Sequence, residues 1–122
     1  MIKGTTDIYC IFGSPVSHSK SPMMHNAAFN ELNMDACYVA FEVRPESLRA
    51  AIEAVRALNI KGLNITVPHK EAVIPLLDWL SPEAKAIGSV NTIKNEDGLL
   101  KGYNTCLLYT SDAADDLLCV DL

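Results

Sequence analysis

The stretch ACYVAFEVRPESLRAAIEAVRALNIKGLNITV, residues 36–67, decides the fold because its pattern of apolar side chains changes twice. Residues 36–43 are rich in β-branched and aromatic side chains, which is typical of a strand. Within residues 45–62, apolar side chains recur at the spacing of one helical face: Leu48, Ala51, Ile52 and Val55. We expect Gly62 to end this helix and residues 63–67 to form the next strand. A strand, a helix and a strand in succession predict a parallel sheet covered by helices.

The same alternation extends on both sides of this stretch. Residues 7–13 form a short apolar run that predicts a strand. Ser21 as a cap and Pro22 in the first turn predict a helix that ends near Asn33. Downstream, we expect a helix over residues 69–80, broken by a proline.

A second Ser-Pro cap predicts a helix from Ser81 to Gly88, followed by two strands around the turn signal NEDG at residues 95–98. The predicted fold is α/β. It is a three-layer sandwich in which a mostly parallel sheet of five or six strands is flanked by helices and ends in a hairpin.

The charge of the chain is unevenly distributed. The 122 residues carry 15 acidic and 10 basic side chains, a net charge of −5. Residues 106–122 hold four of the acids and no Lys or Arg, so the body has 15 − 4 = 11 acids against 10 bases. A nearly neutral body argues against nucleic acid or an anionic membrane as a partner. No signal-peptide pattern begins the chain, so we expect a cytoplasmic protein.

Polar side chains gather where the predicted strands end. Asn64 and Thr66 are two residues apart, so in a strand both point to the same side. Pro68 turns the chain there, and Lys70 opens the next predicted helix. Burying an amide and a hydroxyl costs free energy unless both are hydrogen-bonded. Their partner is then either a bound ligand or the backbone of a nearby loop. Lys70 is the best candidate for a proton donor or acceptor.

Two serines just before the first predicted helix form a second candidate site. Ser19 and Ser21 could cap the helix, or they could bind an anion such as a carboxylate together with the helix N–H groups. The three histidines have no metal-like spacing, and we expect loop or surface positions for His18, His25 and His69.

Four longer motifs follow one another along the chain: IFGSPVSHSKSPMMHNAAF, LNITVPHKEAV, AIGSVNTI and GYNT. In their order and spacing they resemble the N-terminal, substrate-binding domain of the shikimate dehydrogenase family, and the resemblance covers about residues 6–105. This resemblance implies reduction of 3-dehydroshikimate to shikimate with NADPH, in the pathway to aromatic amino acids. A quinate/shikimate dehydrogenase and a binding module without catalysis are the alternatives. A homodimer is one arrangement open to the full-length enzyme.

The resemblance also assigns roles to individual residues. Ser19 and Ser21 are similar to the serines that bond the substrate carboxylate. Lys70 is similar to the catalytic lysine, which exchanges a proton with the reacting oxygen. The residues similar to those that hold the ring hydroxyls are Asn64, Thr66 and Asn91.

The chain departs from the family after Thr105. The family has an aspartate where this chain has Cys106, and a thiol tunes a neighbouring lysine poorly. No G-x-G-x-x-G follows a strand, so we expect the NADP-binding Rossmann domain to be absent and this chain to be inactive. Residues 1–105 are then a truncated shikimate-binding domain, and residues 106–122 are unrelated to it. CLLYTS can be encoded by TGT-CTC-TTA-TAC-ACA-TCT, which resembles a transposase-based sequencing adaptor, so we expect residues 106–122 to be translated adaptor sequence. A frameshift and an unusual fusion are the alternatives.

Overall fold

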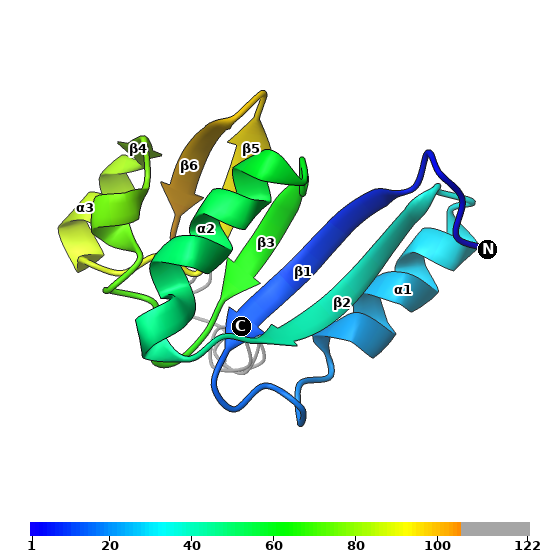
Figure 1. Ribbon diagram of the computed structural model, residues 1–122, viewed down its shortest axis with the longest axis horizontal. Helices are drawn as coiled ribbons and strands as arrows, with labels where there is room; N and C mark the ends of the chain where they lie inside the picture. Colours follow the sequence, from blue (N-terminus) through cyan, green and yellow to red (C-terminus); the bar gives the residue numbers. More distant parts are fainter. Residues whose placement is uncertain (106–122) are drawn as a thin grey trace.

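A computed structural model describes residues 1–105, and its centre is one six-stranded sheet with the order β2-β1-β3-β5-β6-β4 (Figure 1). The strands are β1 (Asp7–Gly13), β2 (Ala36–Glu42), β3 (Gly62–Ile65), β4 (Trp79–Leu80), β5 (Thr92–Glu96) and β6 (Leu99–Tyr103). The helices are α1 (Ser21–Glu31), α2 (Leu48–Ala57) and α3 (Pro82–Ile87), with short 3-10 helices at η1 (Pro45–Ser47) and η2 (Ile74–Leu76).

The sheet is mixed, with parallel pairs in the majority. β1 lies parallel to both β2 and β3, and β4 lies parallel to β6. β5 runs antiparallel to β3 and to β6, which makes the expected terminal hairpin. The hairpin turn is Asp97-Gly98, and both residues have positive φ, 54° and 92°, as a two-residue turn of this kind requires. The α/β prediction is confirmed, including the number of strands.

Alternate residues of β1 face two different layers. Cys10 and Phe12 point into the larger core, where α2 contributes Leu48, Ile52 and Val55. These are the apolar positions expected from the helical spacing, and each fully buried side chain of this size contributes roughly 1.5–3 kcal/mol. On the other face, Ile11 packs with Val16 and Tyr38 beneath α1. The two helices therefore cover opposite faces of the sheet.

The predicted helix over residues 69–80 is wrong. The chain forms turns from Lys70 to Val73, then η2, and then the short strand β4. Pro75 lies within η2 and has no N–H to give to a helix. Lys70 therefore lies in a turn and does not open a helix.

Two expected helix boundaries also differ. Gly62 is the first residue of β3, and α2 ends earlier, before Asn59 takes a left-handed φ of 54°. At the start of α1 the cap position is Lys20, so Ser21 is already inside the helix. The Ser81 cap is confirmed, since its hydroxyl accepts a hydrogen bond from the backbone N–H of Ala84.

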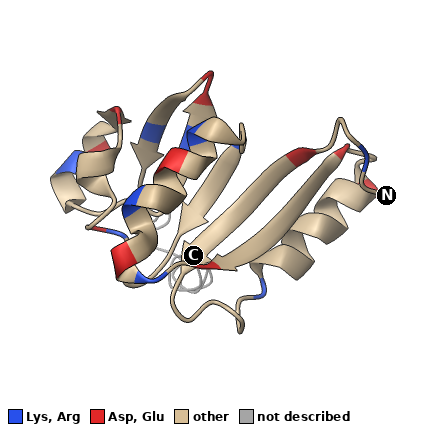
Figure 2. Ribbon diagram, in the orientation of Figure 1, with Lys and Arg blue, Asp and Glu red and all other residues tan. Residues whose placement is uncertain are grey.

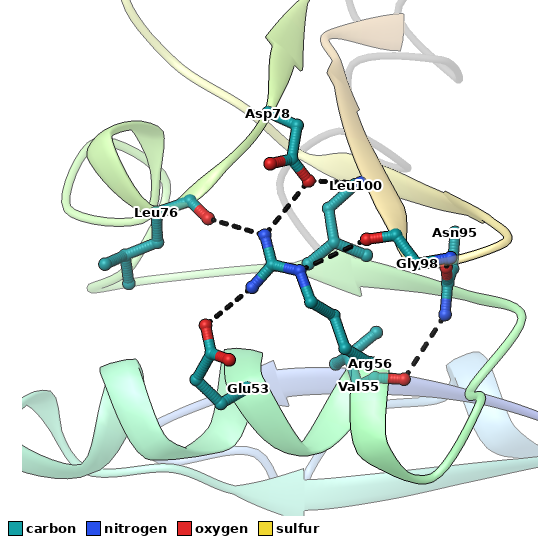
Figure 3. A network of polar contacts seen from close by, with 8 residues as sticks. All are labelled: Glu53, Val55, Arg56, Leu76, Asp78, Asn95, Gly98 and Leu100. Atoms are coloured by element: carbon teal, nitrogen blue, oxygen red, sulfur yellow. Dashed lines mark hydrogen bonds and ion pairs between the residues drawn. The ribbon is translucent and has the colours of Figure 1, made fainter.

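Away from the carboxyl ends of β1 and β3, a polar network joins α2 to the hairpin (Figure 3). The guanidinium of Arg56 contacts Asp78 at 3.0 Å and Glu53 at 2.6 Å. It also donates to the carbonyl groups of Leu76 and Gly98, at 3.3 and 3.2 Å. Its four partners come from α2 itself, from η2 and the residue before β4, and from the hairpin turn, so one side chain holds three segments together.

Charged side chains of both signs are mixed over the ribbon, without a single-sign patch on the sheet (Figure 2). This agrees with the nearly neutral body expected from the sequence. The thiol of Cys10 is buried, and burial raises its pKa to about 12, while Cys37 is half-buried; both are free cysteines. Within residues 1–105 no helix is long and apolar enough to cross a membrane.

Candidate functional site

The carboxyl ends of β1 and β3 lie next to each other and carry the loops that hold most of the predicted site residues (Figure 1). The two loops are tied by backbone bonds, from Thr66 N–H to the Phe12 carbonyl and from Ser14 N–H to the Val67 carbonyl. They also approach closely at Gly13, where a Cβ atom would lie 2.3 Å from the Thr66 methyl. Glycine at this position is therefore what lets Thr66 reach its place beside β1.

Asn64 lies at the centre of a hydrogen-bonded group on the α1 face of the sheet. Its Oδ1 accepts a bond of 2.7 Å from the Tyr38 hydroxyl. Its Nδ2 faces the carbonyl of Asn91 and the hydroxyl of Thr92, both at the long distance of 3.4 Å. Because Oδ1 is held by a short bond, the orientation of the Asn64 amide is fixed.

Asn91 is fully buried and immediately precedes β5, one residue outside the strand that was expected to include it. Its Oδ1 accepts from the Thr92 hydroxyl at 3.0 Å and from the backbone N–H of Thr105 at 3.1 Å. Its own carbonyl accepts from the backbone N–H of Ile65. Asn91 thus joins β3, β5 and the segment that follows β6 at one point.

Lys70 is half-buried in the turn after Thr66. Its carbonyl accepts from the N–H of Val90 at 2.8 Å, which sets this turn beside Asn91. Burial lowers the pKa of the Lys70 ammonium from its ordinary value, because removal from water disfavours the charged form.

His69 is the clearest departure from the positions expected for the histidines. It lies in a loop, but only 1% of its surface is exposed. Its Nε2 lies 2.5 Å from the carbonyl oxygen of Val43, just after β2. His18 is exposed and His25 half-buried, and among residues 1–105 no three His, Cys, Asp or Glu side chains are grouped to hold a metal ion.

The two serines occupy the end of the β1 loop and the start of α1. The hydroxyl of Ser19 accepts a bond of 3.2 Å from the backbone N–H of Ser21. Ser21 is 2% exposed and makes no side-chain cap. The capping that was expected of Ser21 is thus partly supplied by Ser19, and binding of an anion by both serines stays a prediction.

Asn64, Thr66, Lys70 and Asn91 are therefore brought together by bonds between their own loops. A cavity of about 640 Å³ lies beside Asn64 on the α1 face. Its lining residues include Tyr9, Tyr38, Asn64 and Thr92, and Asn64 is the one predicted site residue among them. The predicted site residues as a set offer amides, hydroxyls and one amine of lowered pKa, which suits a small ligand with several oxygen atoms.

The profile of the shikimate dehydrogenase substrate binding domain matches residues 11–93, which is more than half of the chain. The chain belongs to this family. The match covers the loop after β1, the turn that contains Lys70, and Asn91. It confirms the family that the four sequence motifs indicated.

Relatives from the shikimate dehydrogenase family match over the same region. The NADP(+) shikimate dehydrogenase of Caldanaerobacter subterraneus is 52% identical over 104 residues, 85% of this chain. That of Methanothermobacter thermautotrophicus is 53% identical over 105 residues, 86% of this chain. In each case the match spans 37% of the relative's length.

Solved structures of the family share the fold. The shikimate dehydrogenase of Aquifex aeolicus superimposes with a TM-score of 0.89 at 45% identity, over 97% of this chain and 44% of that one. The enzyme of Listeria monocytogenes, solved in complex with shikimate and NAD, gives 0.88 at 39% identity, over 95% and 40%. The α/β fold of residues 1–105 is that of this family.

Two predictions about the end of the chain lie outside the described residues. These are the replacement of an aspartate by Cys106 and the unrelated origin of residues 106–122. The described part ends at Thr105, whose hydroxyl lies 3.3 Å from Asn91 Oδ1.

The sequence patterns did not indicate two residues that support the site. Tyr38 bonds to Asn64, and His69 holds the Lys70 turn against Val43. Tyr38 is an aromatic residue in a strand, which normally indicates only core packing. His69 adjoins Lys70 in the motif NITVPHK, and this proximity was the one available signal.

Proposed function

We propose that residues 1–105 form the shikimate-binding domain of an NADP-dependent shikimate dehydrogenase, which reduces 3-dehydroshikimate to shikimate. The observation that carries the proposal is a half-buried lysine, Lys70, whose turn is bonded to the loop that presents Asn91. The family match and the names of the relatives support the substrate class.

The substrate is a small ring acid with one carboxylate and several hydroxyls. In this proposal Ser19 and Ser21 bind the carboxylate, near the N–H groups at the start of α1. The ring hydroxyls contact the amides and hydroxyl at the strand ends: Asn64, Thr66 and Asn91. These side chains are supported by strands and by bonded loops, so they are arranged before the ligand arrives.

Lys70 acts as the proton donor in the direction of reduction. As hydride reaches the carbonyl carbon, the oxygen gains negative charge and takes a proton from the ammonium. In the reverse direction the amine removes that proton from the hydroxyl. A lysine whose pKa is lowered by burial releases and regains a proton near neutral pH more readily than an exposed one.

NADP is named as the cofactor of the relatives, and in the proposed reduction it would supply the hydride. Residues 1–105 do not fit a dinucleotide, because the loop between β1 and α1 reads SPVSHSK and lacks the glycine-rich turn that lets backbone approach a pyrophosphate. We therefore expect the nucleotide to be held outside these residues. A polypeptide of residues 1–122 should bind shikimate without turning over.

The test is titration of the 122-residue chain with shikimate and with quinate, followed by calorimetry or by NMR. Ser19→Ala should weaken shikimate binding at least tenfold, since a hydrogen bond to a charged group contributes about 1.5–3 kcal/mol. Ser47→Ala is the matched control, because Ser47 is exposed on η1. No binding of either acid would contradict the proposal, and NADPH-dependent turnover by this chain would contradict its predicted inactivity. The cytoplasmic location and the homodimer stay predictions.

A further inference from the structure

Tyr38 occupies a position on the edge strand β2 that is held by α1. The backbone N–H and carbonyl of Tyr38 face away from β1, where an edge strand has no neighbouring strand to bond. The Asn26 side chain satisfies both: its Nδ2 donates to the Tyr38 carbonyl at 2.7 Å, and its Oδ1 accepts from the Tyr38 N–H at 2.8 Å. This double contact fixes the backbone from which the phenol extends.

The ring of Tyr38 is also packed between neighbouring side chains. The imidazole of His25 stacks on it, with 4.4 Å between the ring centres and 19° between the planes. Ile11 and Val16 complete the surrounding cluster, and Tyr38 is 3% exposed. Since β1 lies between β2 and β3, the phenol crosses over β1 to reach Asn64.

The Tyr38 hydroxyl decides which end of the Asn64 amide is available to a ligand. Oδ1 accepts the 2.7 Å bond from this hydroxyl, which occupies one of its two acceptor positions and fixes the oxygen on the side of Tyr38. Nδ2 has only contacts of 3.4 Å within the protein, to Asn91 and Thr92. Contacts of this length are weak and leave the N–H groups able to bond more strongly elsewhere.

We propose that Tyr38 is a positioning residue that holds the Asn64 amide with its N–H toward the cavity, so that Asn64 selects a ligand oxygen that accepts a hydrogen bond. The inference rests on the proposed function, since it concerns how the same site recognises a polyhydroxy acid. Without the phenol, the Asn64 amide would lose the bond that distinguishes its two ends and could rotate.

A double-mutant cycle on the 122-residue chain tests this coupling, with shikimate titrated into wild type, Tyr38→Phe, Asn64→Ala and the double variant. Tyr38→Phe keeps the ring and removes one hydroxyl. It should weaken shikimate binding about five- to tenfold, the size expected when one hydrogen bond is lost. In the Asn64→Ala background the same change should cost clearly less affinity than in wild type, because the hydroxyl then keeps its contact with Ser21 but has lost its bond to Asn64.

Tyr9→Phe is the matched control. Tyr9 pairs with Tyr38 in the register of β1 and β2, and its ring packs on Phe29 at 5.5 Å. Tyr9 also lines the 640 Å³ cavity, but within residues 1–105 no hydrogen bond joins its hydroxyl to Asn64. Any effect of Tyr9→Phe on shikimate affinity should therefore be the same with and without Asn64. An equal loss from Tyr38→Phe with and without Asn64 would overturn the inference, as would unchanged affinity in Tyr38→Phe.

A measurement on the unaltered chain keeps the inference testable if Tyr38→Phe fails to fold. The two Asn64 side-chain N–H signals in a nitrogen-edited NMR spectrum should shift on addition of shikimate. If the backbone N–H signals of the site move while those of the Asn64 amide do not, the inference is wrong. If shikimate moves no signal at all, the proposed function itself fails, which is a separate outcome.

Discussion

The imidazole Nε2 of His69 lies 2.5 Å from the carbonyl oxygen of Val43, and this contact joins the Lys70 turn to the end of β2. The residue before the proposed catalytic lysine is therefore held in the interior. Thr66 and Val73 hold the same turn through backbone bonds to His69.

His69→Phe should lower the free energy of unfolding by about 1–3 kcal/mol, since the buried Val43 carbonyl loses its partner. His69→Gln places an amide nitrogen in a similar position and should retain most of the stability. Urea unfolding of both variants and a shikimate titration are the measurements. If the two variants are equally stable, the contact with Val43 contributes nothing.

Gly13→Ala should displace Thr66. The new Cβ would lie 2.3 Å from the Thr66 methyl, and forcing a group into a packed site typically costs about 1–3 kcal/mol. Shikimate affinity should fall together with stability, because the Thr66 hydroxyl moves as well. The double variant Gly13→Ala/Thr66→Ser removes that methyl and should regain much of both. A double variant no better than Gly13→Ala would place the cause of the loss elsewhere.

The Lys70 amine should titrate below the ordinary lysine value of about 10.4. Because the folded pKa is lowered, the unfolded chain binds more protons between the folded and unfolded pKa values. The cost of burying this charge is therefore present at lower pH and is relieved as the pH rises through that window. The pH dependence of acylation at Lys70, read by mass spectrometry, checks the direction, with Lys70→Arg as an unreactive control. A midpoint at or above the ordinary value would contradict it.

Arg56→Lys should destabilise the fold by about 1–2 kcal/mol without changing shikimate affinity, because lysine keeps the charge but loses the planar fork that contacts several groups. The network joins α2 to the turn between β5 and β6, and this turn lies at the opposite end of the sheet from the carboxyl ends of β1 and β3 (Figure 1). Glu53→Ala is the control: the Glu53 side chain is 67% exposed, and such pairs contribute about 0–1 kcal/mol. A large change in shikimate affinity in Arg56→Lys would show that the network reaches the site.

Protonation of the Asp78 carboxylate at low pH should reduce the stability of the region that Arg56 joins. A hydrogen bond from the Leu100 backbone N–H, and then the Arg56 guanidinium, lower the pKa of the Asp78 carboxyl. A lowered folded pKa contributes stability above the ordinary value near 3.8, and that contribution is lost as pH falls through the folded pKa. Asp78→Asn should therefore show a shallower fall in stability below this value than wild type. Parallel acid unfolding curves would contradict this assignment.

The sequence predicted those parts of the fold that depend on local patterns. The apolar spacing of α2, the Ser81 cap and the Asp97-Gly98 turn each lie within a few residues, and all three are confirmed. The failure over residues 69–80 has a physical reason: helix-forming residues surround Pro75, but the chain there contacts the hairpin and pairs with β6. The secondary structure of this segment is set by tertiary contacts, and the periodicity of apolar residues carries no information about such contacts.

The candidate site was predictable as a set of residues but not as a network. Asn64, Thr66 and Lys70 lie within one short motif at the carboxyl end of β3, so their proximity in space follows from their proximity in sequence. The Tyr38 contact with Asn64 joins β2 to β3 across β1, and that strand order cannot be read from spacing. His69 was assigned to a loop correctly, but its burial depends on where Val43 lies.

The bonds from the Asn26 side chain to the backbone of Tyr38 also affect how the edge strand β2 can pair with other chains. An uncovered edge strand invites pairing with other chains, and β2 carries neither lysine nor proline to prevent it. By occupying both backbone groups of Tyr38, the Asn26 amide interrupts the row of bonds that a foreign strand would need. A substitution at Asn26 would therefore expose the chain to self-association and loosen the Tyr38 phenol at the same time, so that solubility and ligand selectivity are expected to decline together.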